Sequence, residues 1–209
     1  MLEIAHADDA CIVCVKASGM LSVPGRTEPD CLSARVQARF ADALVVHRLD
    51  MATSGLMLFA RGLDAQRQLS RAFAAREVEK RYIAVVHGHI AQAAGEVDLP
   101  LIADWPNRPM QKVDTEHGKP SLTRYRVLSH DLLADTTCVE LQPVTGRAHQ
   151  LRVHMQAIGH AIVGDALYAP AAVGARSDRL LLHAAFLRFA HPVSGEAITV
   201  ESAAPFRRA

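Results

Sequence analysis

The sequence lacks a long hydrophobic run and an N-terminal targeting pattern. None of its 209 residues lie in a stretch approaching the roughly 18 consecutive apolar residues of a membrane-spanning helix. The opening residues, 1–4, do not begin a basic region followed by an apolar one, so the pattern of a secretory signal peptide is missing too. These absences predict a cytoplasmic protein without a membrane partner.

An excess of charge of one sign is also missing. The sequence has 23 Lys and Arg residues against 22 Asp and Glu residues, which gives a formal net charge of +1. This balance neither favours nor excludes a polyanionic partner, because a basic surface can still arise from uneven placement of the cations. Half of the residues are hydrophobic, enough to bury a large core.

Cysteine and histidine are present without a familiar metal-binding pattern. Cys11 and Cys14 have the spacing of a redox or zinc pair, but Cys31 and Cys138 supply no second pair at a matching distance. The run Cys11–Val15 is typical of a buried strand, so we interpret both cysteines as small core residues. The eleven histidines form no cluster with ligand spacing, and the sequence therefore predicts no metal site.

Strand patterns dominate the chain, and helices are few. The predicted strands are Cys11–Lys16, Ala43–Leu49, Gly55–Arg61, Arg81–His87, Leu122–Ser129, Thr136–Gln142, Leu180–Arg188 and Ala197–Glu201. Helical periodicity marks Leu63–Glu77 and Ala148–Ile158, with Gly159 as a C-terminal cap of the second. Without repeats or long linkers, this order predicts one α+β domain, 1–209, built on a large sheet.

A charged island interrupts this apolar pattern at His47–Gly55. It lies between the apolar runs Ala43–Val46 and Leu56–Ala60, which are typical of buried strands. Because Arg48 and Asp50 are costly to bury, we expect a loop held in a cleft, which is the usual setting of a functional site.

A tyrosine on one predicted strand is a second candidate. The alternation of Glu79–Val86 places Tyr82 on the same side as Lys80 and Ala84, so Tyr82 is a candidate to face a cleft. An ordinary half-buried tyrosine with a satisfied hydroxyl is the alternative.

Two further segments are rich in cations. Asp104–Lys112 joins the only tryptophan to two prolines and to Arg108 and Lys112, a composition suited to a surface loop that contacts phosphates and stacks on bases. Thr145–Met155 concentrates two arginines and two histidines at the start of a helix, where backbone N–H groups favour an anion. Solvated surface charge is the alternative for this second segment.

Four motifs, taken together and in order, resemble the RluA family of RNA pseudouridine synthases. HRLDMATSG (47–55) is similar to the family's catalytic-aspartate motif, KRYIAVVHG (80–88) to its tyrosine motif, GRAHQLRVHM (146–155) to its arginine motif and RLLLHA (179–184) to its late strand. The resemblance covers Asp9–Pro205 and implies a mixed, mostly antiparallel sheet with a central RNA-binding cleft. Larger members carry an N-terminal S4 domain. The 46 residues before His47 are too few to hold one as well as the first catalytic strands, so we expect the minimal catalytic form.

The resemblance also implies an activity and assigns residues to it. Such enzymes isomerise uridine to pseudouridine in RNA without metal or nucleotide cofactor. Asp50 is implied to be the catalytic carboxylate, Arg152 to orient it, Tyr82 to stack on the uracil, and Arg48 to displace the target nucleotide. The sequence leaves open whether Asp50 attacks the base, attacks the sugar or removes a sugar proton.

The resemblance extends to the RNA partner. The segment 104–112 and its continuation are similar to a branch of the family that modifies stem-loops of both 23S rRNA and tRNA. We expect a monomer whose remaining RNA-binding residues are His47, Thr53, Arg108, Lys112, Arg147 and His149. The competing hypotheses are a noncatalytic RNA-binding protein on the same fold and a metal-dependent hydrolase that uses the histidines.

Overall fold

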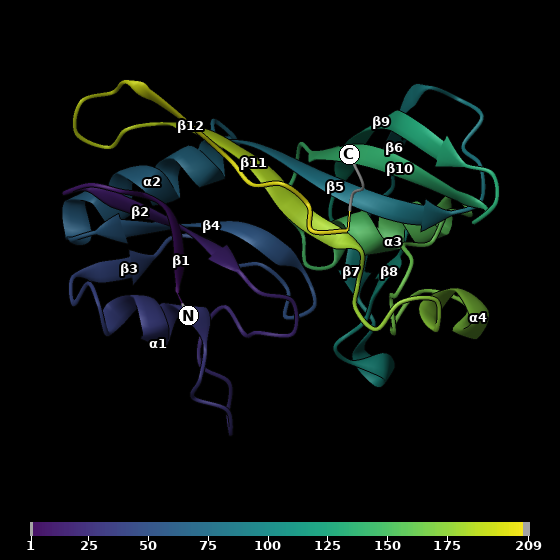
Figure 1. Cartoon of the computed structure of the whole chain (residues 1–209), viewed down its shortest axis with the longest axis horizontal. Coiled ribbons are helices and arrows are strands. Elements are labelled where there is room, and N and C mark those ends of the chain that lie inside the picture. Colours follow the sequence, from purple (N-terminus) through teal and green to yellow (C-terminus); the bar gives the residue numbers. More distant parts are fainter. Residues whose placement is uncertain (1, 207–209) are drawn as a thin grey trace. The chain divides into compact units, whose positions relative to one another are not determined.

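The computed structural model describes residues 2–206 and consists of two compact units (Figure 1). The first unit contains the chain up to Lys80 and again from His183, and the second contains Arg81–Leu182. The charged island is therefore in the first unit, and the other cation-rich segments are in the second.

The first unit is a mixed sheet with two helices. Its strands are β1 (Glu3–Ala7), β2 (Cys11–Lys16), β3 (Ala43–Val45), β4 (Ser54–Arg61), β11 (Leu182–Ala190) and β12 (Ala197–Glu201). They are ordered β1-β2-β4-β11, with β3 paired to β4 and β12 paired to β11. All pairs are antiparallel except β4–β11, in which Ser54 lies opposite His183.

One core cluster of the first unit lies between this sheet and α2 (Leu63–Ala75), while α1 (Leu32–Gln37) contacts β3 (Figure 1). Leu69 of α2 is almost fully buried, and Phe73 packs beside it, as the helical periodicity predicts. They face alternate residues of β2, β4 and β11, which point to one side of the sheet. Every residue of Ser54–Ala60 is buried, so β4 is covered on both faces and provides a rigid base for the loop before it.

The second unit contains the remaining strands and the helix of the arginine motif. Its elements are β5 (Glu79–His87), β6 (Ala94–Asp98), β7 (Leu101–Ala103), η1 (Trp105–Asn107), β8 (Gln111–Val113), β9 (Leu122–Asp131), β10 (Thr136–Pro143), α3 (Gln150–Ala157) and α4 (Ala171–Gly174). Strands β5-β10-β9-β6 are antiparallel neighbours, and β7 and β8 form a separate hairpin. The mostly antiparallel α+β class is thus confirmed.

One predicted strand is too long. The pattern Ala43–Leu49 predicts a strand that continues to the charged island, but β3 ends at Val45. Beyond it, both backbone groups of Leu49 bond to the Ser22 hydroxyl instead of to a neighbouring strand. The predicted strand 43–49 therefore includes part of the loop that carries the charged island.

The cysteines are core residues. All four are free thiols, and Cys11, Cys14 and Cys31 are buried. Burial raises the pKa of the Cys11 thiol to about 12, helped by the charge of Asp8, and that of Cys14 to about 11. His6, Asp8 and Cys11 are grouped closely enough to consider a metal, but the 2.7 Å from His6 Nε2 to Asp8 Oδ2 is a hydrogen-bond distance, whereas two such ligands on one tetrahedral zinc lie about 3.3 Å apart.

Within residues 2–206, no helix is both long enough and apolar enough to cross a membrane.

Candidate active site and RNA-binding residues

Asp50 lies on a tight loop between β3 and β4. Its side chain is half-buried, while Leu49 and Thr53 on either side of it are buried and Arg48 and Met51 are exposed. The Thr53 N–H donates to the Asp50 carbonyl oxygen (3.1 Å) and closes the turn. The loop thus combines anchored residues with exposed ones.

A buried lysine binds the backbone of this loop through hydrogen bonds. Lys16, the last residue of β2, has no exposed surface, and its Nζ donates to the carbonyl oxygens of Ala17 (3.0 Å), Met20 (2.7 Å) and Met51 (2.9 Å). The three acceptors match the three N–H bonds of an ammonium group. A buried charge is tolerated only with such partners, so Lys16 fixes the backbone next to Asp50.

The residues after Lys16 bind the same loop through further hydrogen bonds. Gly19 N–H donates to Met51 O (2.9 Å), and the Ser18 hydroxyl donates to Ala52 O (2.8 Å). The buried Ser22 hydroxyl donates to Leu49 O (2.6 Å) and accepts from Leu49 N–H (3.1 Å). We call Lys16–Ser22 the cradle, because it satisfies backbone groups on both sides of Asp50.

The start of β4 is fixed by close contact with β11. Ser54 Oγ lies 2.8 Å from Nδ1 of the buried His183, whose Nε2 is 3.1 Å from Ser202 Oγ. Gly55 has φ +112°, and a Cβ there would overlap the backbone of Ala184. Only glycine fits this position, which explains why the charged motif ends in Ser-Gly.

His47 is a structural residue of the loop. Its Nε2 accepts the backbone N–H of Leu58 (2.9 Å), and its ring stacks on Phe73 with centroids 4.5 Å apart. Burial lowers the pKa of His47 to about 3, and the charge of Lys80 acts in the same direction. His47 is therefore neutral near pH 7 and shapes the loop as a hydrogen-bond acceptor.

Arg152 and Tyr82 belong to the second unit. Tyr82 is half-buried on β5, opposite Leu141 of β10. Arg152, on α3, is buried and forms a two-bond fork with Asp165, from Nε to Oδ2 (2.8 Å) and from Nη2 to Oδ1 (2.6 Å). This planar fork fixes the orientation of the guanidinium.

The start of α3 is tied to β9 by buried polar side chains. Gln150 Nε2 donates to Leu122 O and Thr123 Oγ1, both at 3.0 Å, while its Oε1 accepts from the Thr145 hydroxyl (2.7 Å). His154 has no exposed surface; its ring nitrogens lie 2.9 Å from Thr123 Oγ1 and 3.0 Å from Leu99 O. Gln150 and His154 of the arginine motif therefore belong to the packed interior and not to a solvated charged surface.

The Trp-containing segment is an exposed arm, Leu101–Val113, made of β7, η1 and β8. Trp105 is 65% exposed, and the Arg108 guanidinium lies 3.1 Å from the centre of its ring. Lys112 is exposed on β8, and Arg147, just before α3, is exposed as well. The arm thus presents a flat cation and an indole to solvent, the groups that stack on bases.

The structure thus divides the predicted residues between its units. The first holds His47, Arg48, Asp50 and Thr53, and the second holds Tyr82, Arg108, Lys112, Arg147, His149 and Arg152. Sequence reasoning did not find Lys16, Ser22, Asp165 or Tyr168. Two sequence signals could have marked some of them: Lys16 ends an apolar strand, and Asp165 belongs to a Gly-Asp pair after the apolar run Ala161–Val163.

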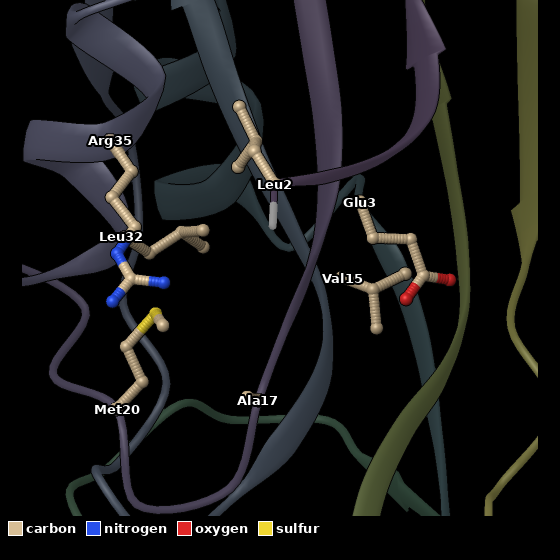
Figure 2. Close-up of a pocket in the computed structure, with 7 residues that line it drawn as sticks. All are labelled: Leu2, Glu3, Val15, Ala17, Met20, Leu32 and Arg35. Carbon is tan, nitrogen blue, oxygen red and sulfur yellow. The ribbon is translucent and has the colours of Figure 1, made fainter.

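A shallow hollow of the first unit includes two cradle residues, Ala17 and Met20, but none of the predicted site residues. Figure 2 shows its lining residues: Leu2, Glu3, Val15, Ala17, Met20, Leu32 and Arg35. None is a predicted site residue, and Glu3 and Arg35 are its only charged groups, so the hollow does not identify a catalytic site.

Comparison with known proteins agrees with the motif set. Residues 10–157 match the model of the RNA pseudouridylate synthase family. The chain belongs to this family. The matched range includes the Asp50 loop, Tyr82 and Arg152, and it spans both compact units.

Relatives of this RNA pseudouridylate synthase are similar over nearly the whole chain. The Dual-specificity RNA pseudouridine synthase RluA of Escherichia coli K12 is 50% identical over 208 residues, covering 98% of this chain and 94% of that protein. The protein of the same name from Vibrio vulnificus is 52% identical over 197 residues, covering 92% and 79%. The solved structure of Human RNA Pseudouridylate Synthase Domain Containing 1 aligns with a TM-score of 0.86 at 30% identity, covering 99% of this chain and 85% of that one.

Proposed function

We propose that this enzyme isomerises uridine to pseudouridine in stem-loops of 23S rRNA and of tRNA. The observation that carries the proposal is the Asp50 loop: the cradle fixes its backbone on both sides of Asp50, while the Asp50 carboxylate stays outside the core. The two RNA classes rest on the similarity to relatives named dual-specificity RluA and on the arm sequence.

The reaction exchanges one bond of the ribose for another. The bond from uracil N1 to C1′ breaks, the base turns, and C5 bonds to C1′. C5 loses its proton and N1 gains one, so there is no net oxidation or reduction. A carboxylate can start this sequence as a nucleophile or as a base, and Asp50 is the group we assign to it.

Two residues of the second unit complete the proposed chemistry. We assign Arg152 to the carboxylate of Asp50, because its guanidinium is already oriented by the Asp165 fork through Nε and Nη2. We assign Tyr82 to stack on the uracil and to assist removal of the C5 proton.

RNA contacts are proposed for the exposed cations. Arg48, next to Asp50 and exposed, is suited to fill the space of an extruded nucleotide. Arg108, Lys112 and Arg147 are exposed and suited to phosphates or unstacked bases. His47, Thr53 and His149 are half-buried or buried, and we assign them to shaping the surfaces that carry these cations.

We further propose that the two units act as one catalytic domain, that the enzyme is a cytoplasmic monomer, and that no metal takes part. The family match that crosses both units supports the first point. Light scattering of the purified protein should give a mass near 22.7 kDa; twice that value would contradict a monomer.

Tritium release tests the activity and its substrates. Transcripts of 23S rRNA and tRNA labelled with tritium at uracil C5 are incubated with the wild type, with Asp50→Asn and with Asp9→Asn, which removes an exposed carboxylate of the same unit as a control. We expect release from both RNAs by the wild type and the control, and none by Asp50→Asn. Folding of each variant is checked by its melting temperature.

Each alternative has a distinct result. Equal release by Asp50→Asn would contradict the catalytic assignment, and release from one RNA class only would reject dual specificity. Binding without release by the wild type would favour the noncatalytic RNA-binding protein. Release abolished by a chelator and restored by a divalent metal would contradict the metal-free mechanism.

A further inference from the structure

Arg152 is fixed by a turn that lies outside the four motifs. Asp165 is buried, and its Oδ1 accepts from the backbone N–H groups of Leu167 (2.9 Å) and Tyr168 (3.2 Å) as well as from Arg152 Nη2 (2.6 Å). The Asp165 carboxylate therefore cannot rotate without losing the hydrogen bonds to the backbone of its own turn. The orientation of the Arg152 guanidinium is set by the turn Asp165–Tyr168.

Tyr168 contacts Arg152 through its ring and the arm through its hydroxyl. The centre of its ring is 5.0 Å from the Arg152 guanidinium carbon, and the side chain is buried. Its hydroxyl accepts the backbone N–H of Gln111 (2.8 Å) and lies 2.6 Å from His149 Nδ1. Because the Gln111 N–H can only donate, a hydroxyl proton directed at His149 Nδ1 satisfies both contacts.

Apolar packing reinforces this connection. Leu101 of β7, Val153 of α3 and Tyr168 form a small buried core, and Met110 and Val113 of the arm pack against it. Val153 follows Arg152 directly in the chain. The base of the exposed arm is thus joined to the catalytic helix by a core and by a hydrogen bond from its own backbone.

We propose that Asp165 and Tyr168 are positioning residues that couple the arm Leu101–Val113 to Arg152. RNA held at Trp105 and Arg108 then stabilises the arm conformation in which Gln111 binds Tyr168, and this conformation holds Arg152 in its active orientation. The inference rests on the proposed function and extends it: the arm promotes the chemical step in addition to binding RNA.

A double-mutant cycle tests this coupling. Tyr168→Phe keeps the ring against Arg152 and removes only the hydroxyl, and Arg108→Ala removes the exposed cation of the arm. The measured quantity is the single-turnover rate of tritium release at saturating RNA, so weaker binding does not enter. Tyr125→Phe removes the hydroxyl of another tyrosine of the second unit, on β9, and is the matched control.

We expect each single variant to lower the saturating rate about tenfold, and the double variant to be about as slow as either one rather than a hundredfold slower. Tyr168→Phe should bind RNA within about threefold of the wild type, and Tyr125→Phe should keep the wild-type rate. A lower melting temperature alone, with an unchanged saturating rate, is the signature of a purely structural hydroxyl.

Two results would overturn the coupling while leaving the proposed function intact. One is a wild-type saturating rate for Tyr168→Phe, and the other is a double variant whose loss is the product of the single losses. No release by the wild type would instead reject the proposed function, and this inference with it.

Discussion

The Asp50 loop and the Arg152 helix are each held by a buried charge from another segment, but that charge binds a different kind of group in each. In the first unit, the Lys16 ammonium binds carbonyl oxygens of the backbone around Asp50. In the second, the Asp165 carboxylate binds the guanidinium of Arg152 itself. Anchoring the backbone leaves the Asp50 side chain out of these bonds, whereas anchoring the Arg152 side chain fixes its direction.

The two arrangements also differ in which buried group loses a partner when Lys16 or Asp165 is substituted. Removing Lys16 leaves neutral carbonyl groups without a donor, while removing Asp165 leaves a buried guanidinium without the carboxylate of its fork. Taking the bidentate carboxylate away from a buried guanidinium costs more than leaving a carbonyl unsatisfied. The comparison therefore predicts a larger loss of stability in the second unit.

The largest effect is expected for Asp165→Ala. It breaks the buried fork to Arg152 and removes two backbone hydrogen bonds, and should lower the free energy of unfolding by about 3–5 kcal/mol, measured by urea denaturation. Asp114→Ala is the matched control, because Asp114 Oδ1 also accepts two backbone N–H groups, from Glu116 and His117, and should cost only about 1 kcal/mol. Equal losses would show that the fork adds nothing to stability.

A smaller loss is expected for Lys16→Met. Methionine has a similar length but no donor, so the carbonyl oxygens of Ala17 and Met20 lose the Nζ donor, whereas Met51 O keeps its bond from Gly19. The free energy of unfolding should fall by about 2–4 kcal/mol, while Lys112→Met, at an exposed position, should change it by less than about 0.5 kcal/mol. A Lys16→Met protein as stable as the wild type would contradict the stabilising role of Lys16 in the cradle.

The smallest effect depends on pH and comes from His47. Its pKa is about 3 in the folded protein and about 6.5 in an unfolded chain. Between these values the unfolded chain binds a proton that the folded protein does not, so the free energy of unfolding falls as pH is lowered from about 6.5 toward 3.

His47→Gln should remove this dependence, because the glutamine oxygen can still accept from Leu58 N–H but does not titrate. Between pH 7 and 4.5 the variant should lose about 1–3 kcal/mol less than the wild type. The exposed His117→Gln serves as the control and should follow the wild type. Parallel curves for all three proteins would contradict a His47 that stays neutral in the folded protein.

The sequence predicted the regular parts of the fold that have strong periodicity. Strands β2 and β12 have the predicted bounds, and the predicted helix 63–77 ends only two residues early, where Arg76 takes a left-handed conformation. Helix α1 was missed because its N-cap is Cys31, whose Sγ accepts from Ala34 N–H, rather than one of the usual capping residues. The three-residue strands β7 and β8 have too few residues to show alternation.

The sequence pattern alone marked only part of the candidate site. Asp50 and Arg48 stand out because charge interrupts apolar sequence, and strand alternation made Tyr82 a candidate. The resemblance to a family supplied the role of Tyr82 and both the choice and the role of Arg152. The partners of the anchors were not predictable, because they are contacts between distant segments: Lys16 Nζ binds Met51 O, and the Tyr168 hydroxyl binds Gln111 N–H. No local pattern shows that a buried lysine binds carbonyl groups or that an arginine already has a carboxylate partner.

The most direct test of the central claim separates RNA binding from chemistry in Asp50→Asn. RNA affinity is measured by fluorescence anisotropy, and the single-turnover rate by tritium release at saturating RNA, with Asp9→Asn alongside. Since the cradle binds backbone and Asp50 supplies only its carboxylate, the variant should bind RNA within about threefold of the wild type and react at least about a thousandfold more slowly. A reaction rate within tenfold of the wild type would contradict the account.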